Sequence, residues 1–177
     1  MSANVLTTWR PMTPDDIPAV YALSRAVHTD YPEREAVLAE KRTLFPAGCF
    51  ALDAGQSADG DTRIVGYAFS HPWSDTPPSL DTFLTALPAQ PSTYFIHDVT
   101  LDERTRGKGH AAAIVPMLIE IARARGLTRT MLVAVNGAEA FWGKSGFVEA
   151  SDTTRQTTVR EKYGPRAILM GRDLSAI

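Results

Sequence analysis

The sequence predicts a mixed α/β domain in which helices flank a central sheet of mixed, mostly antiparallel strands. A strand-like run (Thr93–Leu101), a long helical pattern (Ala112–Arg125) and a continuously apolar run (Thr130–Val135) predict a right-handed crossover between two parallel strands. Upstream, Cys49–Leu52 and Arg63–Ser70 have strand patterns and are separated by a turn-rich loop, which predicts an antiparallel hairpin.

Local signals place the remaining N-terminal elements. Val5–Arg10 is expected to form a short first strand. Thr13 and Pro14 mark the start of a helix, because threonine is a common N-cap and proline is tolerated at the first helical position. A second helix is expected over Glu33–Leu44, ahead of a Pro-Ala-Gly turn.

The segment His71–Ser92 is long and irregular and contains five prolines. Loops of this length in compact domains are usually functional or disordered, and Trp73 and Phe83 favour a packed pocket wall. We expect one or two helical turns inside it, over Leu80–Leu87. The last predicted elements are a short helix, a strand, a turn and a closing strand, at Gly137–Lys144, Phe147–Ala150, Tyr163–Gly164 and Ala167–Arg172.

The composition fits one globular domain over residues 1–177, with 44% apolar and 21% charged residues. A net charge of −2 provides no basic field that would favour nucleic acid or a membrane surface. A single cysteine excludes an internal disulfide, and no cluster of histidines and acids has the spacing of a metal site. Without a signal-like N-terminus or a membrane-spanning run, the expected location is cytoplasmic.

The stretch 106–111 (Arg-Gly-Lys-Gly-His-Ala) joins the first strand of the crossover to its helix. The glycines allow a sharp turn and the close approach of a ligand, and a helix N-terminus offers unpaired N–H groups to an anion. Arg104, Arg106 and Lys108 add positive charge, so the stretch predicts a phosphate-binding turn. A dinucleotide-binding motif fits less well, because no acidic residue follows at the required distance of about twenty residues.

Arg106, Gly109 and Ala111 match a motif of Arg or Gln, two residues, Gly, one residue, and Gly or Ala. An overlapping match that begins at Arg104 places the helix start less well. After the next strand, the stretch 141–147 (Phe-Trp-Gly-Lys-Ser-Gly-Phe) has an aromatic residue followed by Gly-Phe. In this order of strand, turn, helix, buried strand and Gly-Phe, the chain resembles the GNAT family of N-acetyltransferases over nearly its whole length.

The resemblance implies a GNAT-like acyl-CoA N-acyltransferase fold, with acetyl-CoA as co-substrate and no metal. In that family, backbone N–H groups of the glycine turn hold the pyrophosphate, and the preceding strand pairs with the pantetheine arm. The implied cofactor contacts are Val99, Thr100, Leu101, Arg106, Gly107, Lys108, Gly109, His110, Ala111, Ala112, Asn136 and Trp142. The acetyl group would then pass directly to a primary amine of a small molecule or peptide, without a covalent enzyme intermediate.

The resemblance also implies catalytic residues. His97 stands where the family often has an acidic base, and a neutral imidazole suits that role near neutral pH, although a core histidine is an equally good interpretation. Asp98 is the second catalytic candidate, although a carboxylate that caps or binds backbone is an equally good interpretation. As neighbours on the strand, His97 and Asp98 face opposite sides unless a bulge intervenes. Trp142 replaces the tyrosine that protonates the leaving thiolate in many relatives. Either another group such as Tyr163 or a water serves instead, or the thiolate leaves unassisted.

The acceptor side is expected to involve His28, which ends the first helix, where substrate often enters in the family. It is also expected to involve Tyr31, His71 and Trp73, which lie in the segments least typical of the family. The expected partners are acetyl-CoA and an amine acceptor. Dimers are common in the family, so the resemblance also allows a homodimer. Because Trp142 lacks the tyrosine hydroxyl, the alternative function is a non-catalytic sensor that binds CoA or acyl-CoA in the same fold.

Overall fold

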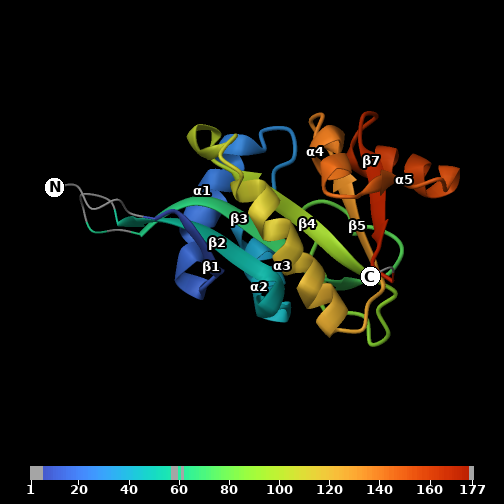
Figure 1. Ribbon diagram of the computed structural model, residues 1–177, viewed down its shortest axis with the longest axis horizontal. Coiled ribbons are helices and arrows are strands. Elements are labelled where there is room, and N and C mark those ends of the chain that lie inside the picture. The colour runs from blue at the N-terminus through green and yellow to red at the C-terminus, as the bar shows by residue number, and fades with distance from the viewer. Residues whose placement is uncertain (1–5, 57–59, 61, 176–177) are drawn as a thin grey trace.

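The computed structural model describes residues 6–56, 60 and 62–175, which form an open seven-stranded sheet with helices on both faces (Figure 1). The strand order is β1-β2-β3-β4-β5-β7-β6, and every neighbouring pair is antiparallel except β4 and β5, which are parallel as predicted. The strands are β1 (Thr8–Pro11), β2 (Cys49–Gln56), β3 (Thr62–Trp73), β4 (Thr93–Leu101), β5 (Arg129–Ala134), β6 (Val148–Glu149) and β7 (Ile168–Asp173).

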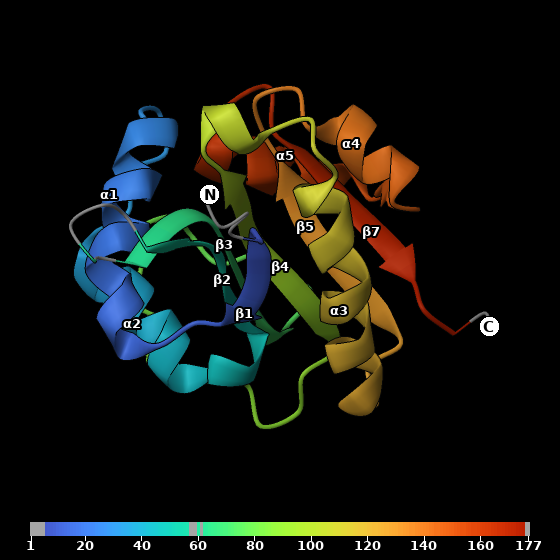
Figure 2. The same cartoon turned by 60° about the vertical axis from the view of Figure 1, so that its left-hand side comes forward.

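In the residues that the structure describes, five α-helices cover the two faces of the sheet (Figure 2). Helices α1 (Ile17–Val27), α2 (Glu35–Leu44) and α5 (Thr153–Tyr163) pack on one face, while α3 (His110–Ala124) and α4 (Glu139–Lys144) pack on the other. The described part of the chain also contains three single turns of 3₁₀ helix: η1 (Pro14–Asp16), η2 (Pro46–Gly48) and η3 (Glu103–Thr105).

Alternation along β4 shows how the sheet separates the core layers. Tyr94 and Ile96 belong to the cluster built on the apolar stripe of α3, which includes Ile114 and Leu118. Phe95, between them, packs on the opposite face in a cluster with Val159 of α5. The central strand is therefore buried on both sides at this point.

A β-bulge interrupts β4 at His97. Phe69 of β3 pairs with Asp98, and the next residue, Ser70, pairs with Ile96, so His97 is an extra residue in the ladder. The regular alternation would have placed His97 and Asp98 on opposite faces. With the bulge, both side chains turn toward the face of α1 and α2, where each finds a polar partner.

The helix after the glycine turn begins two residues earlier than predicted, at His110, and contains Pro116. It ends ahead of Gly126, whose φ of +70° is the left-handed conformation expected for a glycine that terminates a helix. Val5, the predicted start of the first strand, lies outside the described residues, as does part of the hairpin loop.

Two local predictions are wrong. Leu80–Leu87 contains no helix, because the Glu40 carboxylate on α2 accepts the backbone N–H groups of Leu84 and Thr85 (both 2.8 Å) and holds Thr85 at a φ of +63°. Tyr163 does not lie in a turn between strands but is the last residue of α5, a helix that the sequence analysis missed.

Candidate active site

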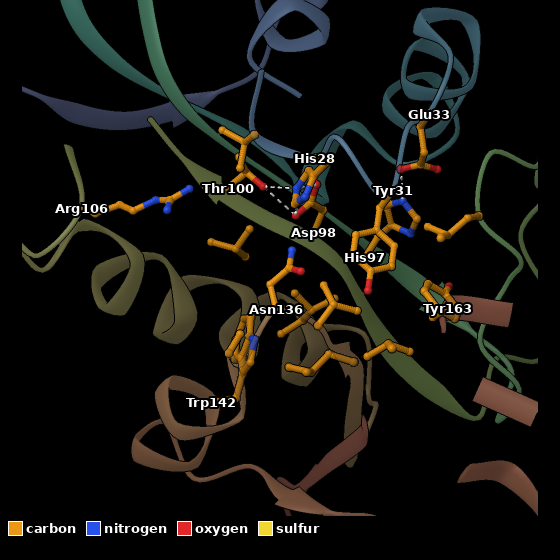
Figure 3. A pocket seen from close by; sticks show the side chains of 18 residues that line it. His28, Tyr31, Glu33, His97, Asp98, Thr100, Arg106, Asn136, Trp142 and Tyr163 are labelled. Carbon is orange, nitrogen blue, oxygen red and sulfur yellow. Dashed lines mark hydrogen bonds and ion pairs between the residues drawn. The ribbon is translucent and has the colours of Figure 1, made fainter. Parts of the chain in front are cut away.

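Strands β4 and β5 pair only over a short length and then separate. Their register covers Tyr94–Ile96 and Thr130–Leu132. Where they separate, a cavity of about 280 Å³ opens between them (Figure 3). Its polar and aromatic lining comes from β4, α4, α5, the segment between α1 and α2, the glycine turn and the loop after β5. The residues are His28, Tyr31, Glu33, His97, Asp98, Thr100, Arg106, Asn136, Trp142 and Tyr163.

The glycine turn lies at one end of this cavity, because Arg106 belongs to the turn and also lines the cavity. Gly107 and Gly109 have φ values of +73° and +83°, and Gly109 is the N-cap of α3. A Cβ added to either glycine would meet no atom within 4 Å, so the turn presents open backbone to its surroundings. The amides at the start of α3 lack intrahelical acceptors, as at every helix N-terminus, and are available to an anion.

Asp98 is the centre of a polar network on the α1 side of the cavity. Its carboxylate accepts hydrogen bonds from the Tyr67 hydroxyl (2.8 Å) and the Thr100 hydroxyl (2.8 Å). His28, the residue that ends α1, places Nε2 3.0 Å from Asp98 Oδ2 and 2.7 Å from Thr100 Oγ1. Burial alone would lower the pKa of His28, but the Asp98 carboxylate more than compensates and raises it.

His97 belongs to a second network, which is more deeply buried. Its Nε2 lies 2.7 Å from Glu33 Oε2, and Lys41 Nζ on α2 lies 3.1 Å from Glu33 Oε1. The side chains of His97, Glu33 and Lys41 are only 2%, 6% and 1% exposed. Burial would raise the pKa of Glu33, but His97 and Lys41 outweigh it and hold that pKa well below its usual range. The carboxylate is therefore ionised inside the protein.

On the α4 side, the cavity is bounded by Asn136 and Trp142. Asn136 has a φ of +54°, an uncommon conformation outside glycine that often marks a functional position. Trp142 is buried and packs edge-on against Phe147, so its indole forms a wall. Tyr163 closes the far end: its hydroxyl donates to the Pro78 carbonyl, and burial raises the pKa of that phenol above its usual value.

His71 and Trp73 lie outside the cavity lining. The His71 ring packs edge-on against Trp73 and Phe95, and its Nδ1 donates to the Pro72 carbonyl at 3.0 Å. Burial lowers the pKa of His71 to about 3, so it is a neutral core side chain at physiological pH.

We expect His71 to make the protein sensitive to mild acid. Because the pKa is about 3 when folded and 6.5 when free, the unfolded chain binds the proton first, and the free energy of unfolding falls as the pH drops from 6.5 toward 3. The difference between these two pKa values corresponds to a loss of at most about 5 kcal/mol in the free energy of unfolding. His71→Phe should flatten this decline in urea unfolding measured from pH 7 to pH 4.

Tyr94→Phe is the matched control for this experiment. It removes a buried hydroxyl whose pKa lies above the usual value and which does not titrate in this range. We expect it to lower the free energy of unfolding by a similar amount at every pH. An unchanged slope in His71→Phe would show that other groups cause the acid sensitivity.

The structure gathers most of the predicted site residues around one cavity. The cofactor candidates Val99, Thr100, Arg106, Asn136 and Trp142, the catalytic candidates His97, Asp98 and Tyr163, and the acceptor candidates His28 and Tyr31 all line it. Leu101 is buried beside β3, and residues 107–112 form the turn and the first turn of α3 rather than the cavity wall.

Sequence reasoning missed the partners of His97. Lys41 occupies the buried face of α2 together with Val37 and Leu38. A lysine at that position of an apolar stripe requires a buried anion, which was a readable signal. Glu33 supplies the anion, but nothing in the sequence shows that its other oxygen reaches the bulge on β4.

In the residues that the structure describes, no three His, Cys, Asp or Glu side chains lie close enough together to hold a metal ion. None of the helices described is long and apolar enough to cross a membrane.

Comparison with known proteins gives the same fold. Ard1 from Thermoplasma volcanium matches with a TM-score of 0.65 and 18% identity, over 94% of this chain and 97% of that one. Rv2747 from Mycobacterium tuberculosis, solved in complex with CoA, matches with a TM-score of 0.62 and 18% identity over 94% and 99%. GphF, a GNAT-like decarboxylase solved with isobutyryl-CoA, matches with a TM-score of 0.72 and 15% identity over 94% and 99%.

At the level of sequence, no curated protein matches the chain. The family model that matches is the acetyltransferase (GNAT) family, over residues 17–147. That span contains α1 to α4, the separated strands and the glycine turn. The chain therefore belongs to the acetyltransferase (GNAT) family.

Proposed function

We propose that this protein is an acetyl-CoA-dependent N-acetyltransferase that passes the acetyl group directly to a primary amine of a small molecule or peptide. One observation carries the proposal: the open glycine turn at the N-terminus of α3 stands at the end of the cavity between β4 and β5. A phosphate-bearing co-substrate held at the turn could extend its arm along β4 into the cavity.

The residues of the turn fit the charged part of CoA. Gly107 and Gly109 leave backbone N–H groups uncovered, and Arg106 and Lys108 are exposed cations beside them. The positive end of the α3 dipole adds to this charge. Solved structures of the fold that contain CoA or isobutyryl-CoA support the choice of co-substrate.

The beginning of the arm would lie against β4. Residues 99–101 follow the point where β4 and β5 cease to pair, so one edge of β4 is available for hydrogen bonds to amide groups of a ligand. When bound, acetyl-CoA would supply an activated thioester carbonyl to the cavity. The protein's own part is to hold this carbonyl near the acceptor amine and to exclude water, as the apolar and aromatic walls would do.

The acceptor is proposed to enter on the side of α1 and α5, near His28, Tyr31 and Tyr163. An amine must lose a proton to attack a carbonyl, and His97 is the proposed base. Trp142 cannot protonate the leaving thiolate, because the indole N–H is too weak an acid. A proton from Tyr163, which its raised pKa keeps protonated, or from water is proposed instead.

Isothermal titration with acetyl-CoA and CoA, followed by a thiol-release assay, tests the function. The acceptor panel should contain amino acids, polyamines, aminoglycosides, arylalkylamines and N-terminal peptides, and propionyl-CoA and isobutyryl-CoA should be compared with acetyl-CoA as donors. We expect saturable binding below millimolar concentration and release of thiol with at least one amine. Absence of binding would contradict the proposal, and binding without turnover on the whole panel would favour the acyl-CoA sensor.

A further inference from the structure

A chain of hydrogen bonds runs from the buried face of α2 to the wall of the cavity. It consists of Lys41, Glu33 and His97. Each oxygen of the Glu33 carboxylate has one partner: Oε1 faces Lys41 Nζ at 3.1 Å, and Oε2 faces His97 Nε2 at 2.7 Å. Figure 3 shows Glu33 joined to the His97 ring beside the cavity. The three residues come from one short stretch around α2 and from the bulge on β4.

The contact to Glu33 determines which nitrogen of His97 carries the proton. An ionised carboxylate can only accept hydrogen bonds, so Nε2 must be the donor. In the neutral ring the lone pair is then on Nδ1. Among the described residues no group makes a hydrogen bond to Nδ1, although the atom is buried. A buried polar atom of this kind normally has a partner, and a ligand in the adjoining cavity can supply one.

Lys41 balances the charge of this chain. Glu33 and Lys41 together are neutral, so the buried group carries no net charge when His97 is neutral. A histidine with an unbalanced carboxylate would instead be held in its charged form. In the described part of the chain, the other titratable groups around His97 are His71 on β3, Asp98 on β4, Tyr163 on α5 and Tyr31 ahead of α2.

We infer that Glu33 and Lys41 are positioning residues that hold His97 as a neutral Nε2–H tautomer, so that Nδ1 takes the proton from the acceptor amine. This inference rests on the proposed function. In the step, an N–H bond of the amine breaks as its nitrogen bonds to the thioester carbon, an Nδ1–H bond forms, and the C–S bond breaks to release the CoA thiolate. Nε2–H stays in place and donates to Glu33, which stabilises the imidazolium without being protonated.

Glu33→Gln tests the assignment sharply. The side-chain oxygen of glutamine is the only atom that can face the Lys41 ammonium, so its NH₂ group must face His97 Nε2. That contact reverses the tautomer and places the proton on Nδ1, where the base is lost. We expect kcat/KM for the amine to fall by roughly 10²-fold or more, with the affinity for acetyl-CoA by titration unchanged.

A double variant distinguishes this effect from damage to the fold. In Glu33→Gln/Lys41→Met the glutamine is free to turn its oxygen toward Nε2, which restores the Nε2–H tautomer. We expect the double variant to recover part of the lost kcat/KM, although it carries more changes than the single variant. Glu35→Gln, the same substitution at an exposed position on α2, should leave kcat/KM and its pH profile unchanged.

Two readouts judge the result. Long-range ¹H–¹⁵N spectra of the histidines should show Nε2–H for His97 in the wild type and Nδ1–H in Glu33→Gln, whether or not an acceptor is known. When kcat/KM for the amine is measured from pH 5.5 to 9, the acid limb of the profile should differ from the wild type in Glu33→Gln. In the double variant it should match the wild type again. A wild-type Nδ1–H signal, or a Glu33→Gln enzyme within twofold of wild type at every pH, overturns the inference. Absence of turnover in the wild type instead overturns the proposed function.

Discussion

Replacing Gly109 with glutamate is expected to abolish acetyl-CoA binding. Gly109 is the N-cap of α3, and its φ of +83° is strained for any residue with a Cβ. The added side chain would occupy the open space in front of the helix amides, and its carboxylate would repel phosphate. We expect the Kd from isothermal titration to rise at least about 100-fold, which corresponds to roughly 2.7 kcal/mol.

Gly126→Glu is the matched control for that variant. Gly126 lies past the other end of α3, has a φ of +70° and also has no atom within 4 Å of an added Cβ. The two substitutions therefore introduce the same side chain at similar backbone strain, but only one of them is at the glycine turn. Equal losses of affinity in both variants would attribute the effect to general destabilisation and contradict the proposed pyrophosphate site.

Replacing Gly48 with alanine is expected to produce the largest loss of stability from a single methyl group. An added Cβ would lie 2.1 Å from the Ser70 carbonyl oxygen and 2.7 Å from Cδ1 of the Phe45 ring. The backbone oxygen belongs to β3, so it cannot move without distorting the sheet. We expect the free energy of unfolding to fall by about 3 kcal/mol or more, with a drop in Tm of roughly 10 °C in calorimetry.

Gly143→Ala makes the same chemical change where there is space. Gly143 lies inside α4 and has no atom within 4 Å of an added Cβ, and alanine is the better helix former. We expect it to leave the stability unchanged or to raise it by up to about 1 kcal/mol. If both variants unfolded at the wild-type temperature, this result would contradict the close packing of η2 against β3.

The central part of the fold could be predicted because its signals are local. Apolar runs specify β4 and β5, the glycine turn and Gly126 delimit α3, and a crossover between parallel strands has only one favoured hand. The same local signals predict the phosphate-binding turn, since glycines ahead of a helix expose its N-terminus wherever they occur.

Helix α5 could not be found from apolar periodicity. Its buried residues are Gln156, Val159 and Tyr163, so a polar side chain occupies part of the face that periodicity relies on. Gln156 is buried because its amide donates to the Ala150 and Leu169 carbonyls (2.9 Å each) and accepts the Leu169 N–H (2.9 Å). The two contacts to Leu169 depend on β7, which follows α5 in the chain.

The acceptor side of the site could be predicted only in part, because it depends on register and on tertiary contacts. The sequence names His97 and Asp98 as candidates, but the pairing with β3 decides that both turn to the same face. In the same way, Glu33 looks like an exposed acid ahead of a helix until the contacts to Lys41 and His97 bury it.

The bulge at His97 also means that the residues that pair β4 with β3 are not the residue proposed as the base. In a β4 shortened by that one residue, Ile96 would still face Ser70 and Asp98 would still face Phe69, and the ladder would run on without a gap. The inserted residue is thus superfluous for strand pairing. The bulge therefore adds the proposed base to the site while the residues on either side of it keep a regular pairing with β3.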